Sequence, residues 1–193
     1  MRYVMGLVCP DERDVTGERS AIRRQDGATP LFIAAQNGHE AACAALLRAG
    51  AAVDAARADR ATPLWIAAQC GRAQAARVLL AAGASVHVAR RDGATPLFKA
   101  AHKGHAQVVA ALLEHSPRPG LLANGQTALH GAAMFGRLAC ARLLAERAPH
   151  LLNARNAAGL TPLQAAQAAG AHDVAALLRS LAPPSAPPSA PHR

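Results

Sequence analysis

One phrase recurs five times along this chain, and its first regular copy reads DGATPLFIAAQNGHEAACAALLRAGAAVDAARAD at residues 26–59. A threonine near the start of each copy marks the period. Successive threonines are 33, 33, 32 and 34 residues apart, at Thr29, Thr62, Thr95, Thr127 and Thr161. Such a period indicates one small structural unit per copy, and a unit of this size cannot bury its apolar face alone. The period therefore predicts five stacked units that share one continuous core.

The residue types within each unit predict two helices followed by a projecting turn. Thr29 suits a helix N-cap, Pro30 suits the first helical position, and Gly38 suits the left-handed residue after a helix end. A pair of alanines in the first helix allows neighbouring helices to approach closely. A pair of leucines in the second helix, Leu46 and Leu47 in the first unit, is expected in the core. Aromatic residues make up only 3% of the chain, so stability must accumulate from contacts between neighbouring units.

Three units depart from this pattern. Arg60 stands where the other units carry the glycine of an Asp-Gly or similar turn, so its turn is expected to be strained or differently shaped. In the third unit, the proline-containing connector HSPRPGLLAN replaces the glycine turn. The last unit has Gln167 in place of the second alanine, and its outer helix carries polar Asp173, Arg179 and Ser180. Polar residues at these places are what a terminal unit facing water requires.

The Thr-Pro-Leu opening and the period near 33 resemble those of the ankyrin-repeat family, over roughly four fifths of the chain. This resemblance implies an all-α ankyrin-repeat solenoid of about five stacked helix-turn-helix units with projecting β-turn fingers. The repeat domain is expected at residues 23–182, with units near 26–59, 60–92, 93–124, 125–158 and 159–182.

The two flanking segments are expected to differ from the repeats. Residues 1–22 do not match the repeated phrase, although IRRQD, just before the first regular unit, resembles the end of a finger. Either this irregular segment caps the first unit, or the chain is a shortened version of a longer array. Residues 183–193 are rich in proline and serine, and we expect a disordered tail there.

Charge and cysteine content limit the classes of partner and the compartment. The net charge is +9, from 21 Lys and Arg against 12 Asp and Glu. No basic run with interleaved aromatics accompanies this charge, so nucleic acid is an unlikely partner. The four cysteines show no zinc-finger spacing and read as small core residues in a reducing compartment. Without a signal peptide or a long apolar run, no membrane association is expected, and the predicted location is the cytoplasm, the nucleus or both.

The sequence offers no set of residues typical of an enzyme. His39, Glu40 and Cys43 only faintly echo a metal-binding HExxH motif, because the second histidine is missing. His102 and His105 lie on either side of Gly104, which is expected to end a helix, so they should not share a face. Neither a phosphate-binding loop nor a dinucleotide fingerprint is present. We therefore expect no catalytic role, no cofactor and no metal.

The position after Thr-Pro-Leu, which holds histidine in most members of the family, is His130 in the fourth unit only. The other units place three aromatic residues and a glutamine there, namely Phe32, Trp65, Phe98 and Gln164. Aromatic residues repeated along a stack could form a ligand ladder. At this position, packing between units is the favoured interpretation.

The resemblance implies a function in protein binding, performed by the finger tips and the exposed ends of the first helices. Carried over by position, the predicted partner-binding residues are Gln36, Asn37, Gln69, Cys70, Arg91, Asp92, His102, Lys103, Asn124, Gln126, Met134 and Phe135, with Gln25, Asp26 and Asp59 on the same surface. Among them, the adjacent Met134 and Phe135 are the best hot-spot candidates, with Arg91, His102 and Lys103 as a basic flank. The alternative is that this pair merely covers the irregular third finger.

The predicted function is thus a non-catalytic protein-interaction module or adaptor, monomeric, with a protein partner that the sequence does not name. The alternative function is a basic surface that binds nucleic acid or an acidic partner through Arg57, Arg60, Arg90 and Arg91.

Overall fold

The computed structural model describes residues 25–115, 122 and 124–181. Within these residues the fold is entirely helical, and no strand is present. The elements are α1 (Pro30–Asn37), α2 (Glu40–Arg48), α3 (Pro63–Gln69), α4 (Ala73–Ala81), α5 (Pro96–Lys103), α6 (Ala106–Leu113), α7 (Ala128–Met134), α8 (Leu138–Arg147), the 3₁₀ helix η2 (Pro149–Asn153), α9 (Pro162–Ala168) and α10 (His172–Leu181). The predicted segments 1–22 and 183–193, and most of the third connector, lie outside the described residues.

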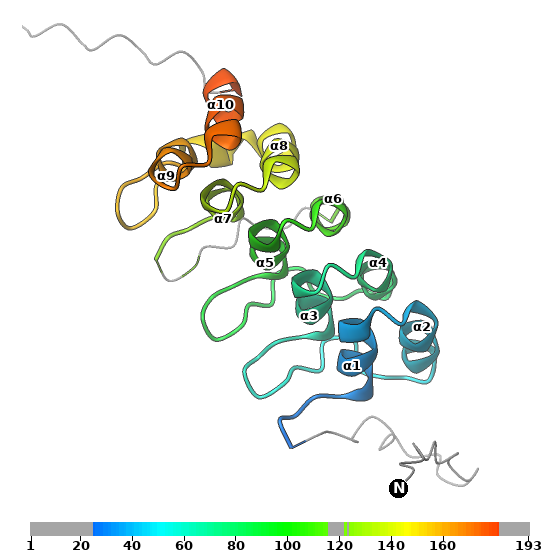
Figure 1. Cartoon of the computed structure of the whole chain (residues 1–193). Helices are drawn as coiled ribbons and strands as arrows, with labels where there is room; N and C mark the ends of the chain where they lie inside the picture. Colours follow the sequence, from blue (N-terminus) through cyan, green and yellow to red (C-terminus); the bar gives the residue numbers. More distant parts are fainter. Residues whose placement is uncertain (1–24, 116–121, 123, 182–193) are drawn as a thin grey trace, which may run out of the picture.

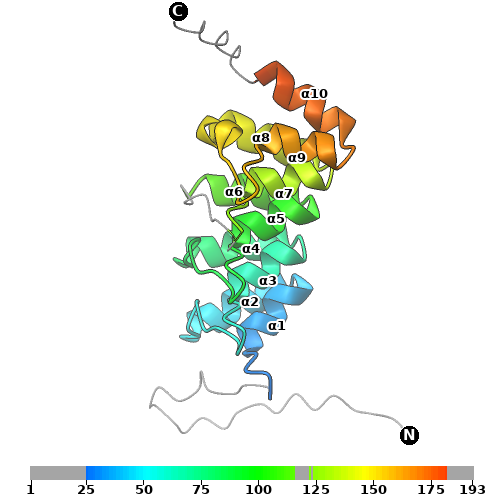
Figure 2. The same ribbon diagram turned by 90° about the vertical axis from the view of Figure 1, so that its left-hand side faces the viewer.

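The helices pair into five hairpins that stack along one axis, as the period predicts (Figure 1). One row contains the first helix of each pair, α1, α3, α5, α7 and α9, and successive members of this row contact one another. The second helices α2, α4, α6, α8 and α10 form the other row, also in contact from one unit to the next. The loops between units project beside the first row, and Figure 2 views the stack from this side.

Each first helix begins at its predicted threonine. The Thr29 hydroxyl oxygen accepts a hydrogen bond from the Phe32 backbone N–H at 3.2 Å, and the four later units repeat this N-cap. A proline at the first helical position follows in every described unit except the fourth, which has Ala128. A hydroxyl that satisfies an otherwise unpaired N–H stabilises a helix by about 1 kcal/mol. The repeated tripeptide therefore fixes where every unit starts.

Small side chains fill the space between the first helices. The alanine pairs of units two to four are fully buried, with Ala35 of unit one. Gln167, which replaces the second alanine in unit five, is exposed at the end of the stack, as predicted for a terminal unit. Close approach of backbones across these alanines gives the stack its continuous core.

The prediction that both leucines of every pair lie in the core was wrong in part. Both are buried only in unit two, at Leu79 and Leu80. In units three to five, one leucine of each pair is buried and the other is half-buried. In unit one, Leu46 and Leu47 are both half-buried, because no described helix packs on the outer side of α1 and α2.

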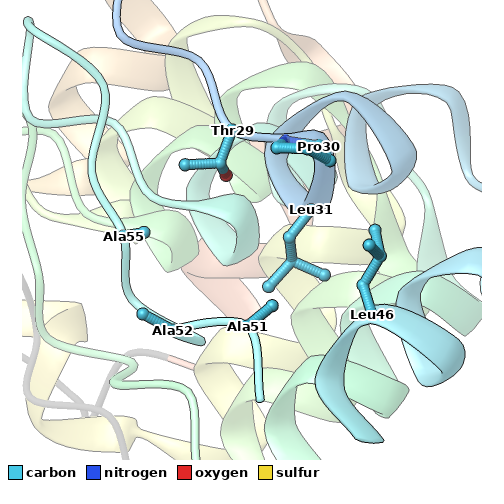
Figure 3. Close-up of a pocket in the computed structure, with 7 residues that line it drawn as sticks. All are labelled: Thr29, Pro30, Leu31, Leu46, Ala51, Ala52 and Ala55. Atoms are coloured by element: carbon cyan, nitrogen blue, oxygen red, sulfur yellow. The ribbon is translucent and has the colours of Figure 1, made fainter. Parts of the chain in front are cut away.

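A small pocket lies in this first unit, between α1 and the start of the following finger (Figure 3). It is lined by Thr29, Pro30, Leu31, Leu46, Ala51, Ala52 and Ala55 and has a volume of about 30 Å³. That is about the volume of one water molecule, and small-molecule sites exceed it roughly tenfold. We therefore assign this pocket to imperfect packing at the end of the described stack.

Candidate partner-binding surface

The tips of the first three fingers are joined by a ladder of alternating charges. Arg57 Nη2 lies 2.6 Å from Asp59 Oδ2, and Arg90 Nε lies 3.1 Å from the same oxygen. Longer pairs at 3.8 Å extend the ladder to Asp26 and to Asp92. The Arg57 guanidinium holds the pKa of the Asp59 carboxyl well below its usual range, with help from the Ala61 N–H and from Arg90. The ladder therefore holds neighbouring fingers in register.

The aromatic residues after Thr-Pro-Leu lie inside the stack. Phe32, Trp65 and Phe98 are all buried, which supports packing between units over a ligand ladder. The Arg57 guanidinium lies 5.2 Å from the centroid of the Phe32 ring, and that of Arg90 lies 5.3 Å from the centroid of the Trp65 ring. Cation–π contacts of this kind stabilise by about 0.5–1 kcal/mol at exposed sites. The same arginines thus join the finger ladder to the core.

A second set of inter-unit contacts, which the sequence did not reveal, closes the other end of the first helices. Arg72 Nε donates to the Gln36 carbonyl at 3.0 Å, a hydrogen bond joins His105 Nε2 and the Gln69 carbonyl at 3.0 Å, and Arg137 Nε donates to the His102 carbonyl at 3.3 Å. Each donor belongs to the residue that follows the helix-ending glycine of its own unit, and each acceptor lies in the last turn of the preceding first helix. We call these residues the clamps. Their one sequence signal is a polar residue recurring after that glycine.

The clamps also explain why three of the glycines that end the first helices, Gly38, Gly71 and Gly104, must be small. Gly38 has φ of 80°, and a Cβ added there would lie 2.8 Å from Arg72 Cδ. The same construction at Gly104 places a Cβ 2.9 Å from Arg137 Cδ. Glycine is therefore needed for its left-handed backbone and for the space that the next unit's clamp occupies.

Exposed apolar side chains concentrate in unit four. Met134 is 36% exposed, Phe135 51% and Leu138 37%, and the only other large apolar side chain that is exposed in the described residues is Leu181 at 40%. Met134, Phe135 and Leu138 lie where α7 ends and α8 begins, and we call them the apolar patch. Leu138 was not predicted, because its position in the other units holds Glu40, Ala73, Ala106 and His172 and gives no apolar pattern.

The apolar patch is fixed by contacts to unit three and to its own finger. The Phe135 ring meets the His102 ring edge-on, with 4.2 Å between centroids, and His102 in turn stacks on Phe98 at 6.1 Å. Gln126 Nε2 lies 3.2 Å from Met134 Sδ. Burial lowers the pKa of His102, and Lys99, Lys103 and Arg137 lower it further. The Phe135 side chain is therefore held against an uncharged His102 ring, and the cations Lys99, Lys103 and Arg137 lie near that ring.

The remaining predicted residues spread along the whole surface. Gln36, Asn37, Arg91, Asp92, Lys103 and Asn124 are exposed, whereas Gln69, Cys70, His102 and Gln126 are half-buried. The structure brings His102 against Phe135 and Gln126 against Met134. It joins Asn124 to Gln126 through a turn, since Asn124 Oδ1 accepts from the Gln126 N–H. The assignment of all twelve residues to partner binding remains a prediction.

The histidines and acidic residues of the described part form no group of three that could hold a metal ion. His102 and His105 contact different elements, Phe135 and the Gln69 carbonyl respectively. No described helix has the length and apolar character needed to cross a membrane.

Stacked helix pairs with projecting fingers define a helical repeat protein. A family model described as ankyrin repeats (three copies) matches residues 7–90, 83–156 and 118–185, and the chain therefore belongs to the ankyrin-repeat family. No curated protein matches the chain. Ankyrin repeats are generally protein–protein interaction modules and are typically not enzymes, so the chain's class of partner is another protein.

Proposed function

We propose that this protein is an adaptor that binds a partner protein on its finger and first-helix surface, with the apolar patch as the main anchor. The observation that carries the proposal is the concentration of exposed apolar side chains in the patch. Of the four large apolar side chains that are exposed in the described part, three lie within residues 134–138. Aromatic and methionine side chains that stay exposed on a rigid frame are typical of binding hot spots.

Order in the free protein supports this anchor. Phe135 is held against His102, so binding requires little further ordering of the side chain. Exposed Lys103 follows His102 in α5, and exposed Arg137 directly precedes Leu138 at the start of α8, so the two provide a basic rim. The alternative that Met134 and Phe135 only cover the third finger concerns a connector that lies mostly outside the described residues. The exposed fractions of Met134 and Phe135, 36% and 51%, support the anchor over this alternative.

A capture experiment with the full chain tests the proposal. Met134→Ala with Phe135→Ala should remove the partner that the parent protein captures, at both about 0.15 M and about 0.5 M salt. Leu181→Ala is the matched control, because it removes an equally exposed apolar side chain at the far end of α10. Circular dichroism of each variant checks that the helices are intact. Undiminished capture by the folded double variant would place the binding site elsewhere.

A basic surface is the weaker candidate. Arg57 and Arg90 are engaged in the charge ladder, so this hypothesis rests on the exposed Arg60 and Arg91. It predicts capture of nucleic acid or of an acidic protein that falls steeply as salt is raised. Capture that resists salt and is lost in the double variant would count against it.

We further propose a monomer located in the cytoplasm, the nucleus or both. The support is that the described cysteines Cys43, Cys70 and Cys140 are free and lie in separate units, as suits a reducing compartment. Microscopy of a tagged chain tests the location, and sedimentation tests the oligomeric state. The individual repeats also look similar to those of ankyrin repeat domain-containing protein twenty-nine. That likeness rests on the repeat sequences alone.

A further inference from the structure

The clamps are present at three junctions between units and missing at the fourth. Arg72, His105 and Arg137 each contact the preceding unit from the position after the helix-ending glycine. In unit five this position holds Ala171, which has no side-chain donor. The carbonyl that a fifth-unit clamp would reach is that of Met134, the counterpart in α7 of Gln36, Gln69 and His102.

The missing clamp leaves a hollow in the surface. A Cβ built on Gly136 would find its nearest neighbour, Ala171 Cβ, at 4.0 Å, whereas at the other junctions the clamp lies within 3 Å. A cavity of about 260 Å³ occupies this place, lined by Gly136, Gly170, Ala171, His172, Asp173 and Val174. We call it the clamp hollow. Small-molecule sites begin at roughly 300 Å³, so the hollow suits a single side chain.

The groups around the clamp hollow favour a cationic hydrogen-bond donor. The Met134 carbonyl is not part of the lining, but it is the counterpart of the carbonyls that the clamps bind at the other junctions. No described side chain donates to it, and it lies at the C-terminal end of α7, where the helix carries partial negative charge. Asp173, an acidic residue, belongs to the lining. Phe135 precedes Gly136 in the chain, but its ring packs against His102 of unit three and does not line the hollow.

We propose that the clamp hollow binds an arginine side chain of the partner protein. The proposal rests on the proposed function and adds to it the residue type that the partner presents beside the apolar patch. Arg72 and Arg137 demonstrate the geometry within this chain, since each donates through Nε to the equivalent carbonyl. Arginine suits the hollow better than lysine, because its planar guanidinium presents several N–H donors in fixed directions.

The test uses the full chain, labelled with ¹⁵N, and N-acetyl-arginine methylamide as the probe. We expect saturable shifts of the Gly136 and Ala171–Val174 amides, with a dissociation constant on the order of 1 mM, because a single side chain supplies little binding energy. The citrulline analogue, which lacks the charge, and the lysine analogue should bind several-fold more weakly. Asp173→Asn should weaken the arginine probe by about threefold, as expected for an exposed charge pair.

A variant that fills the clamp hollow from within gives the sharpest result. Ala171→Arg should abolish binding of the probe and leave the melting temperature equal or higher, since it rebuilds the clamp. Ala176→Arg is the matched control, because it adds the same charge at an exposed position of α10 outside the lining. This control should bind the probe like the parent protein.

Four results would overturn the proposal. The first two are amide shifts with the citrulline analogue as large as those with arginine, and equal or larger shifts with inorganic phosphate at the start of α10. The third is unchanged probe binding by Ala171→Arg. The fourth is a set of shifts that follows protein concentration without the probe, which would assign the hollow to a second copy. These outcomes are separable from failure of the proposed function. The probe titration tests the hollow alone and needs no partner protein. The capture experiment with Met134→Ala and Phe135→Ala tests the partner-binding site alone and needs no probe.

Discussion

The indole N–H of Trp65 donates to the carbonyl oxygen of Ala94 at 2.8 Å. His130 makes the equivalent bond two units later, from Nε2 to the Leu160 carbonyl at 2.9 Å. Both carbonyls immediately precede the capping threonine of the next unit. Trp65 therefore performs the inter-unit bonding of a histidine while burying a much larger apolar surface.

Trp65→Phe tests that relationship. We expect a loss of about 1–3 kcal/mol in the free energy of unfolding, from the lost hydrogen bond and the smaller ring. Equilibrium urea unfolding measures this change. Phe98→Tyr is the control, because it adds a polar atom at the equivalent position of unit three, where no bond like that from the Trp65 indole to a carbonyl exists. A change below about 0.5 kcal/mol for Trp65→Phe would show that the indole bond contributes little.

Arg60→Gly should stabilise the protein. Arg60 has φ of 71°, close to the values of 81° at Gly27 and Gly93 in the same turn, so the turn is strained and keeps its shape. A non-glycine residue in this conformation costs about 1–2 kcal/mol, partly offset by the greater freedom of glycine in the unfolded chain. We expect a net gain of about 0.5–1 kcal/mol in urea unfolding.

The matched control for that change is Gly159→Ala. Gly159 has φ of 74° and nothing within 4 Å of an added Cβ, so alanine adds the backbone strain alone. It should destabilise by a similar amount. A neutral Arg60→Gly together with a costly Gly159→Ala would mean that the Arg60 side chain makes a compensating contribution.

Arg60 also marks a limit of sequence reasoning. The sequence left a strained turn and a differently shaped turn as alternatives. This turn is bonded to both of its neighbours, since the Ala58 N–H donates to the Asp26 carbonyl and the Arg91 N–H donates to the Asp59 carbonyl, each at 3.2 Å. Such contacts between units determine the shape of the Arg60 turn. The local sequence could not reveal them, because the bonded residues are about one repeat apart in the chain.

Local chemistry explains why the fold was predictable. Thr29, Pro30 and Gly38 act within one helix, so their spacing alone indicates where it begins and ends. The clamps were missed because each acts on a carbonyl 35 or 36 residues earlier, and because Arg, His and Ala all occur at that position. Met134 and Phe135 stand out in the sequence as apolar residues at variable positions, and both are exposed, although their role in binding stays a prediction. The clamp hollow depends on a missing side chain and left no such signal.

Asp59→Asn should weaken the contacts between the first three fingers. The variant keeps an oxygen for the Ala61 N–H, now bound at 3.2 Å, but loses the ion pairs to Arg57 and Arg90. Because these side chains are about one third exposed or less, we expect a loss of roughly 1 kcal/mol that shrinks at high salt. Asp26→Asn is the control and should change stability less, because the ion pair of Asp26 with Arg57 spans 3.8 Å. Equal losses in both variants would contradict a central role for Asp59.

His130 should make the protein less stable as the pH falls below neutrality. The Thr127 N–H donates to Nδ1 at 3.2 Å and Nε2 donates to Leu160, so both nitrogens are used by the neutral ring. Burial lowers the pKa of His130, against a smaller raising effect of the Leu160 bond. The unfolded chain therefore gains a proton near pH 6.5 while the folded chain does not, and the free energy of unfolding decreases as pH drops through this range.

The measurement is urea unfolding at pH 7.5 and at pH 5.5, where we expect a loss on the order of 1 kcal/mol. His130→Gln should reduce that loss, because glutamine does not titrate and Gln164 already forms the equivalent capping box in unit five. Part of the loss should persist, since burial lowers the pKa of His102 as well. His130→Gln with His102→Gln should then remove most of the dependence in this range. An unchanged slope in the double variant would mean that other groups titrate between the folded and unfolded states.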